Sequence, residues 1–257
     1  MRIDGKVVLI TGASQGIGAA CAVEFASAGG RLSLTARSAE GLAKVARTDA
    51  LITAGDITQE ETRRAVIERT LERFGCIDIL INNAGAGLYR PSWDAPMEEV
   101  RSLLELNLVA PLALTQLAVP HMRARRSGMI VNVGSIAGKM TLPWLTIYSV
   151  SKCALGALTE GMRMELRRDG VHTMIVCPGY VQTAFQQNAR GGPPPPAMVR
   201  GRRFAITPER CAVAIRKGVE REARTVVTPR SGWLLIGAMR LFPAFVEARM
   251  AAMNQTA

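Results

Sequence analysis

The stretch TGASQGIG, residues 11–18, directly follows the apolar run KVVLI at residues 6–10 and opens a segment with helical periodicity. Glycine permits a tight turn and a close approach of the main chain, and the amino terminus of a helix offers N–H groups and a partial positive charge. A strand, a glycine-rich turn and a helix in this order are typical of the unit that binds a dinucleotide pyrophosphate. The stretch therefore predicts an α/β fold.

The same alternation of short apolar runs and helical segments continues to about residue 181, which is the pattern of a parallel sheet with crossover helices. The expected strands are residues 6–10, 31–35, 50–54, 77–82, 129–134, 172–177 and 225–228. The expected helices are residues 16–28, 38–47, 59–74, 97–125, 147–169 and 208–221. We predict a single Rossmann-type domain: a doubly wound parallel sheet of about seven strands with helices on both faces.

Two segments depart from this alternation. Proline lacks an N–H and fixes φ, so GGPPPP at residues 191–196 predicts an irregular excursion after the sixth strand. The apolar run at residues 233–239 is too short to span a bilayer and is followed by Arg240 and Pro243. We expect the catalytic domain to cover residues 1–230 and an apolar extension, residues 231–257, to pack on that domain or on a partner subunit. Contact of the extension with a membrane stays open.

Composition excludes several classes of protein. The 257 residues are 48% hydrophobic and 21% charged, so the chain can bury a core and does not resemble a disordered segment. The net charge of +11 is scattered over many helices and aromatic residues are only 5%, so we expect a basic solvated surface and no specific nucleic-acid partner. Five widely spaced cysteines without a CxxC pair, and no apolar leader before the first strand, predict a reduced cytoplasmic protein. Two histidines without a carboxylate cluster predict no metal site.

The glycine spacing is GxxxGxG, and here the sequence resembles the classical short-chain dehydrogenases/reductases, whose signature is TGxxxGxG. Further motifs of that family follow in order: NNAG at residues 82–85, YSVSK at residues 148–152 and PGxxxT at residues 178–183. The resemblance covers roughly residues 4–230. It implies an oxidoreductase that transfers a hydride between a nicotinamide cofactor and a carbonyl or secondary alcohol.

Four residues match the catalytic tetrad of the family: Asn107, Ser135, Tyr148 and Lys152. The resemblance implies that Tyr148 exchanges a proton with the substrate oxygen, Ser135 positions that oxygen, Lys152 holds the ribose hydroxyls and Asn107 holds a water near Lys152. Proton exchange near neutral pH requires a phenol pKa below the ordinary value of about 10. Lys152 lies one helical turn after Tyr148, so we expect its ammonium to supply part of that decrease.

The end of the second strand selects between the two nicotinamide cofactors. An acidic residue there binds the ribose 2′-OH of NAD(H), whereas the 2′-phosphate of NADP(H) favours an arginine. The sequence has Ala36 in place of the acid and then Arg37, so we expect NADP(H), with NAD(H) less favoured. The expected cofactor-binding residues, several implied only by the resemblance, are Gly12, Ser14, Gln15, Gly16, Ile17, Gly18, Arg37, Ser38, Asp56, Ile57, Asn83, Ala84, Gly85, Tyr148, Lys152, Pro178, Gly179, Val181 and Thr183.

The substrate pocket of the family is built from the loops after the fourth, fifth and sixth strands. The expected substrate-binding residues are Leu88, Ser135, Trp144, Tyr148 and Phe185. Further candidates in the same loops are Tyr89, Ile136, Met140, Leu142, Pro143 and Val181. A largely apolar lining favours a small lipophilic ketone or alcohol.

Two other functions stay open at this point. The substrate could be a 3-oxoacyl group on an acidic carrier protein, because Arg125 and Arg126 stand roughly where the acyl reductases carry carrier-binding arginines. The protein could also be a regulator that binds NADP(H) without turnover, although the intact tetrad argues against it. The resemblance further implies a homodimer or homotetramer.

Overall fold

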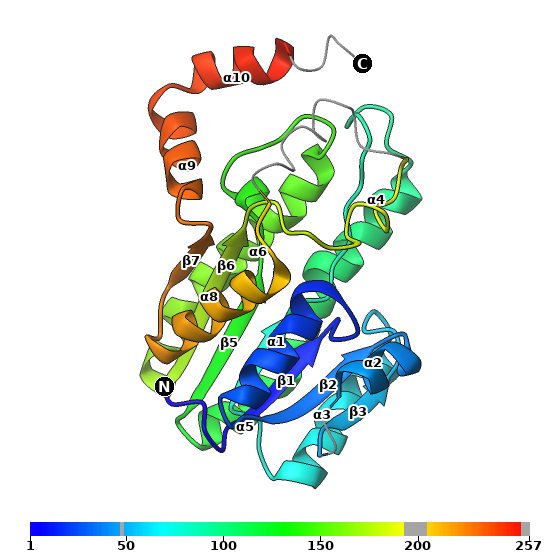
Figure 1. Cartoon of the computed structure of the whole chain (residues 1–257), viewed down its shortest axis with the longest axis vertical. Helices are drawn as coiled ribbons and strands as arrows, with labels where there is room; N and C mark the ends of the chain where they lie inside the picture. The colour runs from blue at the N-terminus through cyan, green and yellow to red at the C-terminus, as the bar shows by residue number, and fades with distance from the viewer. Residues whose placement is uncertain (47–48, 193–204, 253–257) are drawn as a thin grey trace.

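The computed structural model describes residues 1–46, 49–192 and 205–252, and it contains one seven-stranded parallel sheet (Figure 1). The strands are β1 (Val7–Thr11), β2 (Arg31–Ala36), β3 (Leu51–Ala54), β4 (Ile79–Asn82), β5 (Gly128–Val133), β6 (Val171–Pro178) and β7 (Thr225–Thr228). Their order is β3-β2-β1-β4-β5-β6-β7, so the direction of winding reverses between β1 and β4. This confirms the predicted fold class and places the switch point, where such sheets bind ligands, beside the glycine turn.

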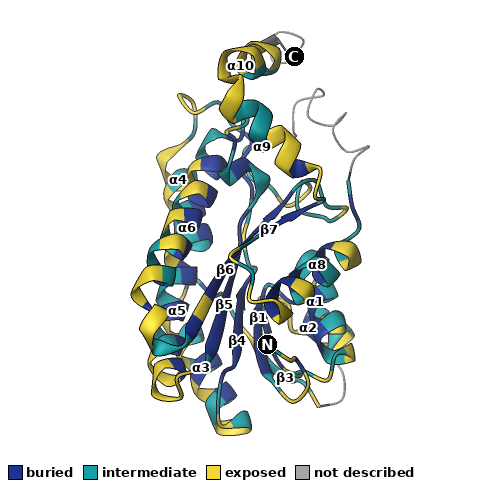
Figure 2. Cartoon of the chain, turned by 90° about the vertical axis from the view of Figure 1, so that its left-hand side faces the viewer, coloured by how far each residue is buried: buried dark blue, intermediate teal, exposed yellow. Residues whose placement is uncertain are grey.

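Helices cover both faces of the sheet (Figure 2). One face is covered by α1 (Gly16–Ser27), α2 (Ala39–Val45) and α8 (Pro208–Glu220), and the other by α3 (Glu60–Phe74), α5 (Ala110–Ala124) and α6 (Thr146–Glu165). Because side chains alternate along a strand, Val8 and Ile10 enter the core under α1 whereas Leu9 enters the core under α5. Every residue of β1 is buried, as expected for a strand covered on both faces.

A long helical run carries part of the site. It consists of α4 (Met97–Leu104), the π-helical turn η1 (Glu105–Val109) and α5, and it has the length and the mean hydropathy, 1.5, of a membrane-spanning helix. Its inner side nevertheless packs on the sheet, where Leu114, Ala118 and Met122 are fully buried in the core. We therefore interpret it as a core helix.

Short elements complete the chain: the 3₁₀ turns η2 (Ile136–Gly138) and η3 (Arg167–Asp169), and the C-terminal helices α9 (Gly232–Leu241) and α10 (Pro243–Ala252). Helix α9 follows β7, and the two helices extend beyond the rest of the chain at one end (Figure 1). Residues 193–196 of the predicted proline-rich excursion lie outside the described residues.

Candidate active site

The glycine turn between β1 and α1 has the main-chain geometry that only glycine adopts without strain. Gly12 and Gly16 have φ values of +65° and +56°. A Cβ at Gly12 would lie 2.9 Å from the Ala84 Cα, and one at Gly18 would lie 2.2 Å from the Gly12 carbonyl oxygen. Helix α1 begins here, and its N-cap residue, Gln15, makes no side-chain capping hydrogen bond. The turn thus presents main-chain N–H groups and a helix amino terminus to a phosphate.

Hydrogen bonds hold the NNAG segment, residues 82–85, against this turn. The Thr11 hydroxyl oxygen accepts hydrogen bonds from the main-chain N–H groups of Asn83 and Ala84, both at 3.0 Å. The Asn83 side-chain amide donates to the carbonyl oxygens of Thr11 at 2.9 Å and Gly12 at 3.2 Å. These four bonds fix residues 83–85 along one wall of the cavity that the glycine turn borders.

Ser135, Tyr148 and Lys152 come together at the carboxyl ends of β5 and β6, where the sequence predicts them. Ser135 precedes η2, accepts a hydrogen bond from the Ala137 N–H at 3.1 Å and hydrogen-bonds to the Tyr148 phenol. Lys152 lies one turn after Tyr148 on α6, with its Nζ 5.9 Å from the centre of the phenol ring. The Lys152 Nζ donates to the Val133 carbonyl oxygen at 2.9 Å.

Burial sets the protonation states of the catalytic pair. It raises the pKa of Tyr148 from 10.0 to about 12, against the opposing effect of the Ser135 hydrogen bond. It lowers the pKa of Lys152 from 10.5 to about 8. The expected lowering of the Tyr148 pKa by Lys152 is therefore not found in the chain alone, because desolvation is the largest influence on the phenol and only the Ser135 hydrogen bond opposes it. At neutral pH the phenol is protonated and the ammonium is charged, as a proton donor and its charged neighbour should be.

Asn107 is fully buried on the π-helical turn η1. Its side-chain oxygen accepts from the Ala86 N–H at 2.9 Å, and its amide donates to the Ala86 carbonyl at 2.9 Å and to the Ser151 hydroxyl at 3.0 Å. These contacts hold the loop after β4 against α6. The predicted water near Lys152 stays a prediction. Both side-chain N–H groups of Asn107 already have protein acceptors, so Asn107 could hold such a water only through its side-chain oxygen or its main chain.

The adenosine end of the cavity contains the residues expected to select the cofactor. Arg37 and Ser38 are exposed at the end of β2, and the Ser38 hydroxyl accepts a hydrogen bond from the Gly41 N–H at 2.9 Å. A Cβ at Gly41 would lie 2.9 Å from the Ser14 Cβ, so Ser14 packs against the start of α2. Asp56 also borders the cavity, and one of its carboxylate oxygens accepts from the N–H and the hydroxyl of Thr58.

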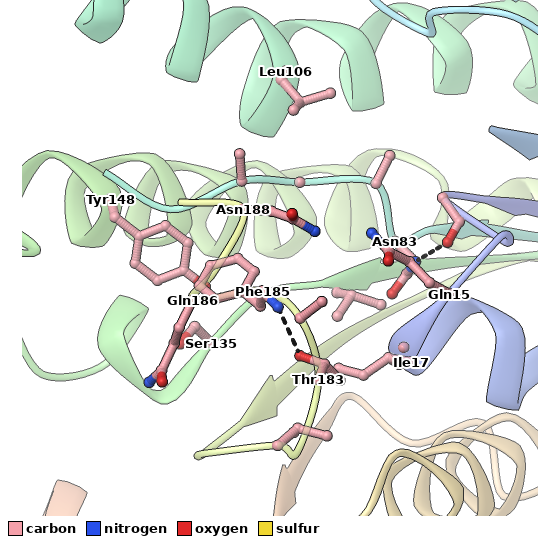
Figure 3. Close-up of a pocket in the computed structure, with 18 of the residues that line it drawn as sticks. Gln15, Ile17, Asn83, Leu106, Ser135, Tyr148, Thr183, Phe185, Gln186 and Asn188 are labelled. Carbon is pink, nitrogen blue, oxygen red and sulfur yellow. Dashed lines mark hydrogen bonds between the residues drawn. The ribbon is translucent and has the colours of Figure 1, made fainter. Parts of the chain in front are cut away.

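The segment after β6 closes the opposite wall. The Thr183 Cγ2 would lie 3.1 Å from a Cβ at Gly16, so this segment reaches across to the first residue of α1. The Phe185 ring lies over the Tyr148 ring with the ring centres 5.5 Å apart. Figure 3 shows Tyr148, Ser135 and Phe185 at one end of the cavity and Gln15 at the other.

The cavity has a volume of about 1020 Å³ and runs from the Arg37 end to the Tyr148 end. Most predicted site residues border it, and so do residues that we did not predict, among them Leu106, Gln186, Asn188 and Arg190. The last three follow Phe185 in the segment after β6, so extending the pocket along that segment would have found them. For Leu106, the only feature of the sequence that could have indicated a place in the cavity wall was its position next to Asn107.

Six predicted residues lie outside the cavity wall that the described residues form: Gly18, Leu88, Asn107 and Trp144, and the further candidates Met140 and Pro143. Leu88 pairs with Arg190 in an isolated bridge. Leu88 and Tyr89 are both buried in the cluster that contains Tyr148, and of the two only Tyr89 borders the cavity. Trp144 has a φ of +63°, and its carbonyl accepts from the Arg90 N–H at 2.9 Å. Gly18 serves the close packing of the turn, since a Cβ there would collide with Gly12.

Comparisons with known proteins identify the family. A family model described as short chain dehydrogenase matches residues 6–193. The chain belongs to the short chain dehydrogenases. It is 34% identical over 232 residues to a ketoacyl reductase, HetN, of Nostoc sp. strain PCC 7120, in an alignment that covers 88% of this chain and 79% of that protein. It is also 34% identical over 238 residues to 11-beta-hydroxysteroid dehydrogenase-like 2 of Arabidopsis thaliana, with 89% and 75% covered.

Solved structures agree with this assignment. A short chain dehydrogenase from Burkholderia cenocepacia J2315, solved in complex with NADP, superposes with a TM-score of 0.83 at 27% identity and covers 97% of this chain and 99% of that one. Similar structures have been solved with NADP or with NADH. This short chain dehydrogenase is accordingly an oxidoreductase that acts on CH–OH or carbonyl groups with a nicotinamide cofactor.

The site residues fit such a cofactor, because Gly12, Gly16 and the amino terminus of α1 border the cavity, and Gly12 lets the main chain of the turn pack against Ala84. When bound, the nicotinamide supplies or accepts the hydride. In this geometry Ser135 would position a substrate oxygen, and the protonated Tyr148 would donate a proton to it in the reducing direction. Lys152 would keep a positive charge beside the phenol. Among the described residues, no group of three or more His, Cys, Asp or Glu side chains could hold a metal ion.

Proposed function

We propose that this short chain dehydrogenase is an NADP(H)-dependent enzyme that interconverts a small lipophilic ketone and its secondary alcohol. The observation that carries the proposal is the apolar wall around the Tyr148 end of the cavity. It is formed by Ala86, Tyr89, Leu106, Leu142, Leu145 and Phe185. An apolar pocket with two hydroxyl groups at its end suits a carbonyl on a lipophilic body.

The preference for NADP(H) rests on the residues after β2. Ala36 and Arg37 leave this edge without a carboxylate and with an exposed guanidinium, which can bind a 2′-phosphate bidentately. The hydroxyls of Ser14 and Ser38 border the same end of the cavity and can donate further hydrogen bonds. Membership of the family supports either nicotinamide cofactor, so the preference depends on these residues alone.

A 3-oxoacyl thioester on a carrier protein is the second candidate, and the similarity to the ketoacyl reductase of Nostoc favours it. The two arginines that suggested carrier binding are engaged elsewhere. Arg125 forms an ion pair of 2.8 Å with the buried Asp78, and Arg126 donates to the Arg168 carbonyl at 3.0 Å. Both precede β5 and therefore lie at the amino end of the sheet, whereas the catalytic residues lie at its carboxyl end. A carrier would have to be recognised by other residues.

The oligomeric state, the location in the cell and the exclusion of a regulator without turnover are further proposals. A homodimer or homotetramer is supported by membership of the family, whose enzymes are commonly oligomeric. A cytoplasmic location is supported by five free cysteines. A regulator that binds NADP(H) without turnover is disfavoured, because Ser135, Tyr148 and Lys152 are brought together in the geometry of a catalyst.

Consumption of NADPH against a panel of substrates tests the proposal. The panel contains lipophilic ketones, 3-oxoacyl thioesters of a small thiol, and the same acyl groups on a carrier protein. We expect the highest kcat/KM with a lipophilic ketone. Turnover confined to the acyl thioesters would replace the proposal with the second candidate, and NADPH binding without turnover on any member would support the regulator.

A further inference from the structure

The C-terminal helices expose an unusual amount of apolar surface. Of the twelve large apolar side chains that are exposed in the described chain, six lie within residues 233–245. We call them the tail patch: Trp233, Leu234, Leu235, Leu241, Phe242 and Phe245. Leu234, Leu241 and Phe245 are about three-quarters exposed, at 77%, 74% and 74%. Exposed apolar side chains concentrated in one segment in this way indicate a site of contact with a protein or a membrane.

The first residues of α9 anchor the tail patch to the core of the domain. In α9 only Gly232 and Ile236 are buried, and Ile236 joins a core cluster that includes Val227 of β7. A Cβ at Gly232 would lie 3.1 Å from the Ile136 Cδ1, and Ile136 directly follows Ser135 and borders the cavity. Helix α9 therefore starts beside the catalytic segment, and α9 and α10 extend from that end of the molecule (Figures 1 and 2).

The charges around the tail patch identify the contact that suits it. Residues 230–252 contain three exposed arginines, Arg230, Arg240 and Arg249, and one acidic residue, Glu247. Apolar helices with tryptophan, phenylalanine and arginine are typical of segments that lie in the interface of an anionic bilayer. A symmetric contact between two copies would instead bring together two surfaces that both carry a net positive charge.

We propose that the tail patch docks this protein on an anionic membrane surface. The apolar side chains would enter the boundary between headgroups and acyl chains, and the arginines would meet the lipid phosphates. Docking there would place the catalytic end of the sheet toward the lipid. The proposal concerns binding only, so it stands or falls independently of the substrate and of the cofactor preference.

Co-sedimentation of the full chain with vesicles tests this. We expect binding to vesicles that contain phosphatidylglycerol, and much weaker binding to vesicles of phosphatidylcholine alone. The double variant Leu241→Ser/Phe242→Ser should bind the anionic vesicles about tenfold more weakly or worse, because two apolar side chains no longer enter the lipid. The variant Arg240→Glu/Arg249→Glu should lose the preference for the anionic lipid.

Matched controls separate docking from folding. Val23→Ser and Met164→Ser change exposed apolar side chains on α1 and α6, at 56% and 75% exposure, and should leave vesicle binding unchanged. All variants should keep the NADPH affinity of the wild type. Absence of vesicle binding by the wild type, or equal loss in the control variants, would overturn the proposal. So would a drop in molar mass, measured by sedimentation, for Leu241→Ser/Phe242→Ser without any vesicle binding, since the tail patch would then be a contact between copies.

Discussion

Replacing Lys152 with methionine should abolish turnover and nevertheless stabilise the chain at neutral pH. Burial lowers the pKa of Lys152 from 10.5 to about 8, so the folded state holds its ammonium less readily than the unfolded state does. At about 1.4 kcal/mol for each pKa unit, the charge costs the folded state about 3 kcal/mol at pH 7. Methionine removes the charge and also the hydrogen bond to the Val133 carbonyl, which contributes about 1 kcal/mol. The net gain is about 2 kcal/mol in the free energy of unfolding.

The pH dependence of this gain has a definite sign. Between pH 8 and pH 10.5 the unfolded wild-type chain binds a proton at Lys152 that the folded chain has released, so the stability of the wild type rises with pH in this window. The methionine variant lacks that titration. Its advantage should therefore be largest below pH 8 and should disappear as the pH approaches 10.5.

Urea unfolding of the cofactor-free proteins at pH 7 and pH 10 measures both effects. Lys44→Met is the control, because the Lys44 side chain is 72% exposed and its loss should change the stability little at either pH. Two results would refute this prediction. One is a lower free energy of unfolding for Lys152→Met than for the wild type at pH 7, and the other is the same difference in free energy of unfolding between the two proteins at pH 7 and pH 10.

Three further substitutions probe the other parts of the site. Arg37→Asp should lower kcat/KM for NADPH by about a hundredfold or more and leave turnover with NADH intact, because a charge-assisted contact with the 2′-phosphate becomes a repulsion. An unchanged preference for NADPH over NADH would exclude Arg37 as the residue that selects the cofactor. Gly18→Ala should destabilise the chain, because its Cβ would lie 2.2 Å from the Gly12 carbonyl oxygen, whereas Gly161→Ala has open space and should stabilise α6 by about 1 kcal/mol in thermal unfolding. Phe185→Ala should uncover the Tyr148 ring and move its pKa down from about 12, which would appear as a shift of the pH profile for alcohol oxidation toward lower pH.

All seven strands could be predicted from the sequence, because each is a short run rich in apolar residues, and the boundaries differ from the prediction by at most two residues. The grouping of Ser135, Tyr148 and Lys152 followed from the resemblance to the family. Contacts between distant loops could not be predicted from the sequence. The hydrogen bonds that tie Asn107 to Ala86 and Ser151 depend on how the loop after β4 meets α6, and no local pattern reports this.

Electrostatic detail was the least predictable property. The spacing of Tyr148 and Lys152 shows that they share a helix face, but the direction of the Tyr148 pKa depends on how deeply Phe185 and the other pocket residues bury the phenol. The sequence likewise did not show which of Leu88 and Tyr89 borders the cavity, because this depends on the pairing of Leu88 with Arg190. The exposure of the tail patch likewise depends on where α9 leaves the sheet after β7.

We propose that Tyr148 donates the proton to a carbonyl substrate in an NADP(H)-dependent reaction. The measurement that tests it most directly is NADPH consumption by Tyr148→Phe with the best ketone of the panel, alongside a titration of NADPH binding to the same variant. The phenylalanine keeps the ring that packs on Phe185 and removes only the hydroxyl. We expect NADPH affinity close to that of the wild type and no turnover. Turnover comparable to the wild type would contradict the account.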